Sequence, residues 1–343
     1  MVGEAILSGL ASGQAIDGNT GSDIATVSFK CTVCGKCCNT APLMSVPELF
    51  RHENLFVGCL AIRRISRRKT GEILAIQAAQ HTVSAADVQL LTEMAADQLF
   101  NPGTLNSGGD YDFSIMTQAM DYESLQKCPA LGADYHCAIQ NAGKPAVCTM
   151  VPFDSLYPDS LQNIVLMSRD FAESCIVQGL RDDYPVVVRD GQVADRQYRQ
   201  ALKHRRDDLG MEKLCWGDAV FEMLRNEGFC HPAAAVKIPL DHGLVSLSII
   251  PVLLAIAGLS EKCAARCLQY ADSQIKLIDS KINQAISRKS AADKQTTQEF
   301  RVFRETYLKF RPQLLAAQTA AKSFPAETGS QSRVEAMEMY LGV

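Results

Sequence analysis

The stretch FKCTVCGKCCN at residues 29–39 places Cys31, Cys34, Cys37 and Cys38 within eight positions. Two residues between cysteines let the chain reverse, so both sulfurs of a C-x2-C pair can point at one metal ion. Gly35 comes directly after Cys34, where such a turn often needs the positive φ that glycine adopts without strain. The rest of the chain is therefore expected to be organised around a metal site.

Four further cysteines extend this candidate site, namely Cys128, Cys137, Cys148 and Cys175. A tetrahedral ion takes four thiolates, so eight imply two metal ions, a polynuclear cluster, or one site with spare cysteines. Crowded thiolates repel one another, and a bound cation must offset their charge, which couples local folding to metal loading. The neighbours Cys37 and Cys38 point to opposite sides of an extended segment, so they either bridge two centres or serve one centre and the core. Thiolates suit zinc and iron–sulfur centres alike, and both remain open.

Composition limits the class of protein. The chain has 343 residues, a net charge of -4 and a pI of about 5.9, which gives no electrostatic reason to expect nucleic acid or anionic lipid as a partner. The first residues lack the basic start of a signal peptide, so we expect a cytoplasmic protein whose 13 cysteines serve mainly as ligands, redox groups or buried apolar residues. The apolar run at 244–259 is shorter than the roughly 20 residues of a membrane span; it predicts a buried helix or a strand followed by a helix.

Helix signals predict a mostly helical α+β protein. Ser45-Val46-Pro47-Glu48 fits a capping box that starts a short helix, and Ser84-Ala85-Ala86-Asp87 opens an amphipathic helix. Two apolar seams follow near the C-terminus, one of Ala271, Ile275, Ile278, Ile282 and Ile286 and the other of Phe300, Phe303, Tyr307 and Phe310. Their spacing predicts an antiparallel helical hairpin, which serves either internal packing or the binding of a protein partner.

These signals divide the chain into four parts. Residues 1–25 are a flexible arm, 26–190 an irregular cysteine-cluster metal domain, 191–322 a helical domain ending in the hairpin, and 323–343 a frayed polar tail.

The order of motifs resembles a known family. Phe29-x-Cys31-x2-Cys34-Gly35-x-Cys37-Cys38 is followed by Cys128-Pro129-x-Leu131, Cys137-x-Ile139, Lys144-Pro145, Cys148 and Pro152-Phe153. This order is similar to the YkgJ-type cysteine-cluster family, the zinc- or iron-chelating CxxCxxCC domain, over about residues 29–180. Cys175 stands where such proteins often carry a further cysteine. Gln140, Lys144 and Thr149 replace the Tyr, Arg and Arg usual in the family.

The resemblance implies a metal-binding protein in a structural or electron-transfer role. Family members are often called iron–sulfur oxidoreductases, and a related domain occurs in flagellin lysine methylases. The alternative is therefore an iron-dependent oxidoreductase or protein-modifying enzyme acting on a protein partner, with the C-terminal helices as the docking surface. No phosphate-binding glycine loop, G-x-S-x-G or H-E-x-x-H motif favours another class of enzyme.

Several residues are weaker candidates. His136 lies beside Cys137 and is interpreted as a partly exposed turn residue, with a ligand or proton-carrier role as the alternative. Cys230-His231 with His242, and the pair Cys263 and Cys267, are interpreted mainly as packed residues. The basic run Arg63, Arg64, Arg67, Arg68 and Lys69 is interpreted as a solvated face of a helix or turn, with a phosphate or acidic partner as the alternative.

Overall fold

The computed structural model describes residues 26–76, 79–102, 110–167, 175–241, 243–323 and 331–343. About 52% of the chain is helical and 16% is strand, which confirms the predicted α+β, mostly helical class. The predicted N-terminal arm and His242 lie outside the described residues.

A three-stranded antiparallel sheet forms the centre of the fold, in the order β5 (Tyr111–Met120), β2 (Val57–Ser66), β9 (Val245–Ser248). Its two faces differ because side chains alternate along each strand. Leu60, Ile62 and Ile115 belong to the main apolar core. Ala61, Arg63 and Met116, which lie between them, line a cavity on the other face.

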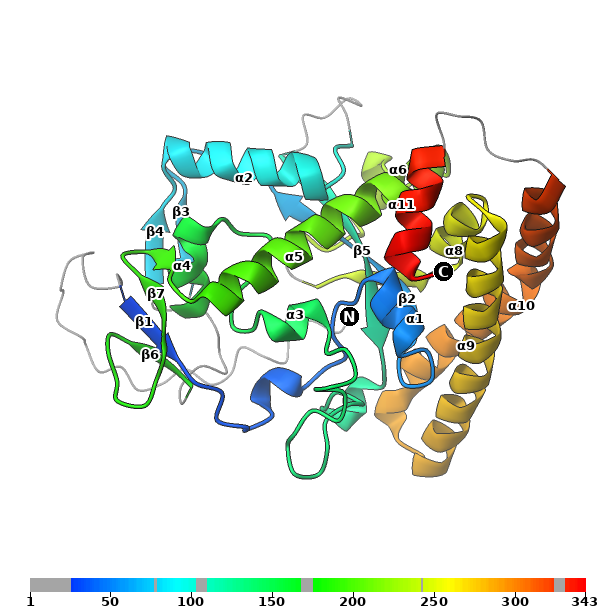
Figure 1. Cartoon of the computed structure of the whole chain (residues 1–343), viewed down its shortest axis with the longest axis horizontal. Helices are drawn as coiled ribbons and strands as arrows, with labels where there is room; N and C mark the ends of the chain where they lie inside the picture. The colour runs from blue at the N-terminus through cyan, green and yellow to red at the C-terminus, as the bar shows by residue number, and fades with distance from the viewer. Residues whose placement is uncertain (1–25, 77–78, 103–109, 168–174, 242, 324–330) are drawn as a thin grey trace.

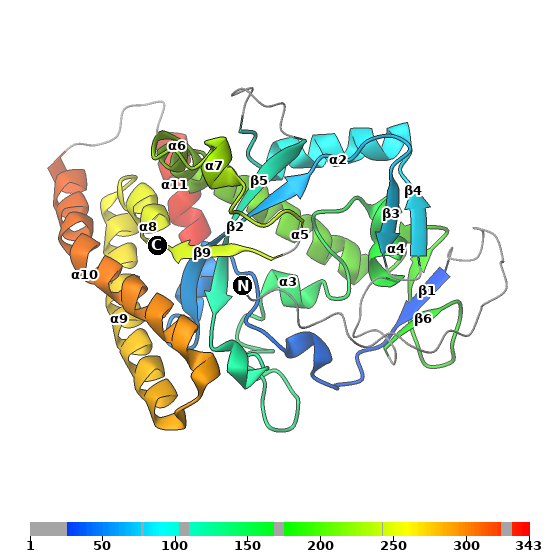
Figure 2. The same ribbon diagram turned by 180° about the vertical axis from the view of Figure 1, so that it is seen from behind.

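Helices cover the core face of this sheet. α8 (Ile250–Ala257), α9 (Glu261–Arg288) and α10 (Lys294–Ser323) pack together, and α9 and α10 form the predicted hairpin along one end of the molecule (Figures 1 and 2). The apolar run at 244–259 is strand β9 followed by α8, as one of the two predicted arrangements had it. Within the described ranges, no helix combines the length and apolar content needed to cross a membrane.

One position of the predicted seam on α9 is wrong. Ile286 is 56% exposed, whereas Ala285 is buried. The buried stripe steps from Ile278 to Ile282 and then to Ala285, because four-residue steps alone overshoot the helical period of 3.6. Gln274 takes a buried position in the same stripe, and its side-chain amide bonds Gly58 N–H and the carbonyls of Glu53 and Phe56 at 2.8–3.1 Å.

A second, smaller sheet has the order β6 (Ile176–Gln178), β1 (Thr26–Phe29), β7 (Val186–Arg189), β8 (Gln192–Val193). It packs with α5 (Arg196–Glu212) around a separate small core. The main core, in contrast, contains residues from both sides of position 190. The predicted division into two domains stays a prediction.

The remaining helices and strands surround these two sheets. They are α1 (Val46–Arg51), β3 (Ile73–Ile76), β4 (Ala79–Thr82), α2 (Ala85–Gln98), α3 (Ala146–Thr149), α4 (Gln162–Met167), α6 (Asp218–Asn226), α7 (Pro232–Ala235) and α11 (Gln331–Leu341). Ser45 forms the predicted capping box of α1, and Ser84 begins the predicted helix α2, where it forms a capping box with Asp87. The predicted tail contains α11, in which Met337 is fully buried, so this part of the tail is packed.

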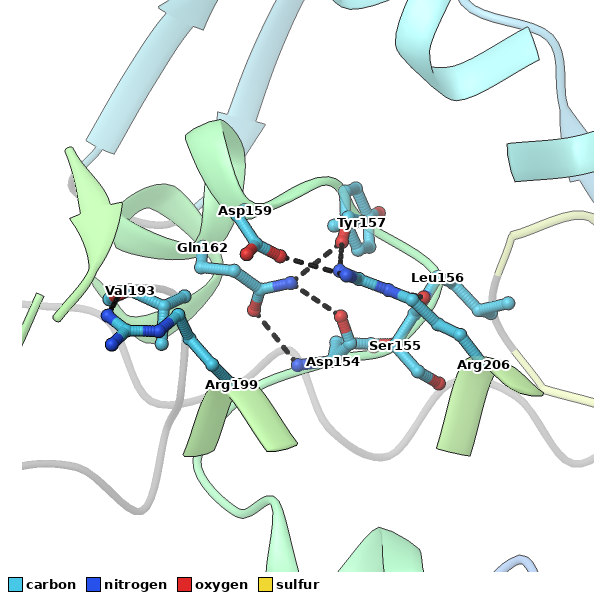
Figure 3. Close-up of polar contacts among 9 residues, drawn as sticks. All are labelled: Asp154, Ser155, Leu156, Tyr157, Asp159, Gln162, Val193, Arg199 and Arg206. Carbon is cyan, nitrogen blue, oxygen red and sulfur yellow. Dashed lines mark hydrogen bonds and ion pairs between the residues drawn. The ribbon is translucent and has the colours of Figure 1, made fainter. Parts of the chain in front are cut away.

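A polar clamp holds the loop that follows Cys148 against α5. The buried Gln162 amide bonds Asp154 N–H and the carbonyls of Asp154 and Tyr157 at 2.6–3.0 Å. Arg206 from α5 donates to the carboxylate of Asp159 at 2.9 Å and to the carbonyl of Tyr157 at 2.7 Å (Figure 3). The loop is therefore held in place by side-chain hydrogen bonds from both Gln162 and Arg206.

Charged groups are also buried where α1, α5 and α11 meet. Glu212 accepts a hydrogen bond from Val46 N–H at 2.7 Å, and burial raises the pKa of this carboxyl group to about 7. The ionisable groups that face it are Arg205, Asp208, Glu48 and Tyr340. The neutral form of Glu212 is thus favoured by its surroundings.

Candidate metal centre

The first cysteine segment begins where the small sheet ends. Lys30 N–H donates to the carbonyl of Cys175 at 2.9 Å, and Phe29 pairs with Ile176 across β1 and β6. The chain therefore reaches Cys31 just after β1 ends, at the same end of the sheet where Cys175 precedes β6. Lys36–Cys38 then forms a single 3-10 turn, and Cys31, Cys34 and Cys37 are exposed.

Gly35 has the positive φ that the sequence predicts, at +72°. A Cβ atom at this position would lie 2.8 Å from Cδ1 of Tyr135 and 3.3 Å from Cδ2 of Leu131. Glycine is thus required both for the backbone turn and for close approach to the loop between Cys128 and Cys137.

The second cysteine segment lies directly against the first. Cys128 N–H donates to the carbonyl of Cys38 at 2.8 Å, and a short bridge between Leu131 and Cys137 closes the loop. Cys148 lies in α3, whose first residue, Ala146, donates its N–H to Glu48 Oε1 at 2.6 Å. The sequence indicates Glu48 only as a capping residue of α1; its second oxygen also fixes the helix that carries Cys148.

The structure brings all eight predicted cysteines to one cavity of about 530 Å³. They come from chain segments up to 144 residues apart, since the first is Cys31 and the last Cys175. The sulfurs of Cys37 and Cys38 are 4.0 Å apart. The hydrogen bond between these two thiols is the main reason that the pKa of Cys37 is raised and that of Cys38 lowered.

Two sets of thiols are distinguished by their influence on one another's pKa. The pKa of Cys175 is raised first by burial and then by Cys34, Cys37 and Cys31, and these four are called the first tetrad. The pKa of Cys38, lowered by its bond to Cys37, is raised in turn by Cys148, Cys128 and Cys137, and these four are called the second tetrad. The sulfurs of Cys37 and Cys38 connect the two sets, and backbone bonds join the Cys175 segment to Lys30 and the Cys128 segment to Cys38.

Burial and charge set the chemistry of these thiols. Burial raises the pKa of Cys148 to about 12, and the thiol of Cys128 adds to this effect. Lys144 acts in the opposite direction on Cys37 and Cys148. His136 also lines the cavity, and its exposed ring contacts the carbonyl of Asp134 at 3.1 Å, as expected of a turn residue.

The donor set fits a thiophilic metal. Among the described residues the cavity wall contains eight cysteines and neither Asp nor Glu. Magnesium and calcium prefer oxygen ligands, whereas zinc and iron–sulfur centres accept sulfur. Within the described part of the chain, however, no three His, Cys, Asp or Glu side chains are close enough to hold one ion. Binding would need the sulfurs of a tetrad to draw together.

The other candidate residues lie elsewhere. Cys263 and Cys267 are fully buried in the main core, and Cys230 is 7% exposed there, which agrees with their interpretation as packed residues. His231 caps α7 through its Nδ1, which accepts from Ala233 N–H. The remaining cysteines of the main core are Cys59 and Cys215.

The interpretation of the basic run as a solvated face of a helix or turn is wrong for its first residues. Arg63 and Arg64 lie in β2, and the residues after the strand pair with acidic side chains of the protein itself. Arg63 was not identified from the sequence as a cavity residue. Because residues two apart in a strand lie on the same face, the small residue Ala61 and Arg63 could have been expected on one face of the sheet.

Comparisons with family models, with curated proteins and with solved structures find no match for this chain. The resemblance to the CxxCxxCC family therefore rests on the motif order alone and stays a prediction.

Proposed function

We propose that the protein binds metal through its eight clustered cysteines, as two centres of four thiolates each that hold zinc or iron–sulfur. The first centre would use Cys31, Cys34, Cys37 and Cys175, and the second Cys38, Cys128, Cys137 and Cys148. One observation carries the proposal: these thiols, scattered through the sequence, line a single cavity.

The charge at the cavity supports metal loading. Four thiolates around one divalent ion carry a net charge of about -2, which a low-dielectric site tolerates only with nearby cations. Lys144 is placed to offset part of this charge, because it influences one thiol of each tetrad, Cys37 and Cys148. A bound zinc ion would cross-link segments that are distant in the chain. A bound iron–sulfur centre would do the same and could also accept and donate electrons.

A second candidate function is catalytic. The cavity of about 530 Å³ is within the usual range of small-molecule sites, roughly 300–1,000 Å³, and is larger than two metal ions require. This size favours a redox or protein-modifying enzyme with the cysteine centre as cofactor. A protein partner at the C-terminal helices belongs to the same proposal; α10 exposes Val302, Leu308 and Leu315.

Elemental analysis and absorbance spectra of anaerobically purified protein test the proposal. We expect either a colourless protein with zinc or a brown protein absorbing near about 400 nm. Cys34→Ser and Cys148→Ser should each remove one centre, about half of the metal. Cys263→Ser is the matched control, because that thiol is buried in the main core, and it should leave the metal content unchanged. A folded wild-type protein without metal would contradict the proposal, and full loading of both tetrad variants would contradict the ligand assignment.

A further inference from the structure

The floor of the cysteine cavity is one face of the central sheet. Three residues of β5, Ser114, Met116 and Gln118, line the cavity. Arg63 pairs with Ser114 and Ala61 with Met116 across the two strands, so these side chains lie side by side on the floor. The cysteines therefore cover only part of the wall, and the sheet supplies the rest.

Arg63 differs from the other basic residues of its run. Arg64 donates to the carbonyl of Ile238 at 2.9 Å, and Arg67 forms two hydrogen bonds to Asp112. Arg68 pairs with Glu72, and Lys69 with Asp110. Among the described residues, none forms a hydrogen bond or ion pair with the side chain of Arg63. A half-buried guanidinium without an internal acceptor is suited to bind an anion.

The charge of the wall points to the same ligand. No carboxylate of the described chain lines the cavity, whereas Arg63 and Lys144 do. Lys144 acts on the thiols of Cys37 and Cys148. Arg63 also lines a second cavity, whose wall contains Asp112, Asp154 and Asp241, and its charge influences Tyr157 there. Arg63 therefore stands between two cavities, of which the cysteine cavity is the one whose described lining residues include no carboxylate.

Two further features of the wall bear on the body of the ligand. Met116, Leu43, Val147 and Leu244 supply apolar wall. The side-chain oxygen of Gln118 is buried and accepts no hydrogen bond within the described structure. This oxygen is enclosed by protein atoms, so it would meet a ligand in the cavity only after the Gln118 side chain turns.

We propose that the cavity binds a small organic anion, whose carboxylate or phosphate pairs with Arg63 and whose apolar body lies along the sheet toward the cysteines. This inference extends the proposed function by naming the class of molecule brought to the metal centre. It depends on Arg63 and the other side chains of the sheet that line the cavity, so it can be tested separately from metal binding.

Isothermal titration of the protein as purified tests the proposal with three eight-carbon probes, octanoate, octan-1-ol and octylammonium. We expect octanoate to bind at one site, octan-1-ol at least about tenfold more weakly, and octylammonium not measurably. Arg63→Gln should lower octanoate affinity by about ten- to a hundredfold, to the level of the alcohol. Arg63→Lys should keep part of the affinity, since it retains the charge.

The matched control is Arg301→Gln, which removes the same charge from an exposed position on α10 and should leave octanoate affinity unchanged. Metal content is measured for every variant. A metal-loaded wild-type protein that binds no octanoate, or equal effects of Arg63→Gln and Arg301→Gln, would overturn the inference and leave the metal proposal standing. Arg63-dependent octanoate binding in a protein without metal would support the inference while the metal proposal failed.

Discussion

Glu48 is the residue whose replacement most directly tests how the fold holds the second tetrad. Its carboxylate is 8% exposed and accepts two backbone hydrogen bonds, from Ser45 at 2.8 Å and from Ala146 at 2.6 Å. The first begins α1, and the second begins the short helix that carries Cys148. Glu48→Ala should therefore loosen both helices together.

The expected loss of stability follows from these two bonds. Hydrogen bonds to a charged group contribute about 1.5–3 kcal/mol each, so losing both costs about 3–6 kcal/mol. Removing Glu48 also relieves its repulsion of Glu212, whose pKa is raised mainly by burial and in part by Glu48. We expect the free energy of unfolding to fall by about 3 kcal/mol, and by about half as much in Glu48→Gln, which keeps one acceptor oxygen.

Urea unfolding of metal-free protein measures this change, and elemental analysis after dialysis measures metal retention. Glu305→Ala, at an exposed position of α10, serves as the control and should change stability by less than about 0.5 kcal/mol. Glu48→Ala should also retain less metal than wild type. An unfolding free energy within about 0.5 kcal/mol of wild type would refute the proposed role of Glu48.

Three further perturbations have defined outcomes. Burial raises the folded-state pKa of Glu212 from 4.5 to about 7. The contribution of neutral Glu212 to the free energy of unfolding is therefore full below pH 4.5 and is lost as the pH rises through about 7. Glu212→Gln should make the free energy of unfolding less dependent on pH, and at pH 8 this variant should be more stable than wild type by about 3 kcal/mol. Gly35→Ala and Gly71→Ala both place alanine at positive φ, at a cost of about 1–2 kcal/mol, but only Gly35→Ala adds a close contact with Tyr135. Thermal unfolding should show the larger loss of stability for Gly35→Ala, and equal losses for the two variants would argue against that contact. Gln274→Leu leaves three buried backbone groups unpaired and should lower the unfolding free energy by about 3 kcal/mol or more, measured in urea; a loss below about 1 kcal/mol would contradict this account.

Local features of the fold could be predicted from the sequence because their causes are local. The capping boxes at Ser45 and Ser84 need only residues three positions apart. The positive φ of Gly35 depends on one turn, and the hairpin of α9 and α10 depends on two periodic seams. Each of these signals lies within one stretch of chain.

Features that depend on distant contacts could not be predicted in the same way. The pairing of β2 with β5 and β9 decides that the face of the sheet carrying Arg63 borders the cavity, and no residue near Arg63 in the sequence specifies those partner strands. The spacing of the cysteines indicated which residues gather, but not which segments meet. Backbone hydrogen bonds join Lys30 to Cys175 and Cys128 to Cys38, and each connects distant parts of the chain.

Thiol alkylation followed by mass spectrometry tests the central claim most directly. Cys31 and Cys34 are exposed, so without a bound metal they should react rapidly with N-ethylmaleimide, whereas the buried Cys263 and Cys267 should not. The account predicts that Cys31 and Cys34 are protected in the protein as purified and become reactive after chelation. Equally fast alkylation of Cys31 and Cys34 before and after chelation would contradict it.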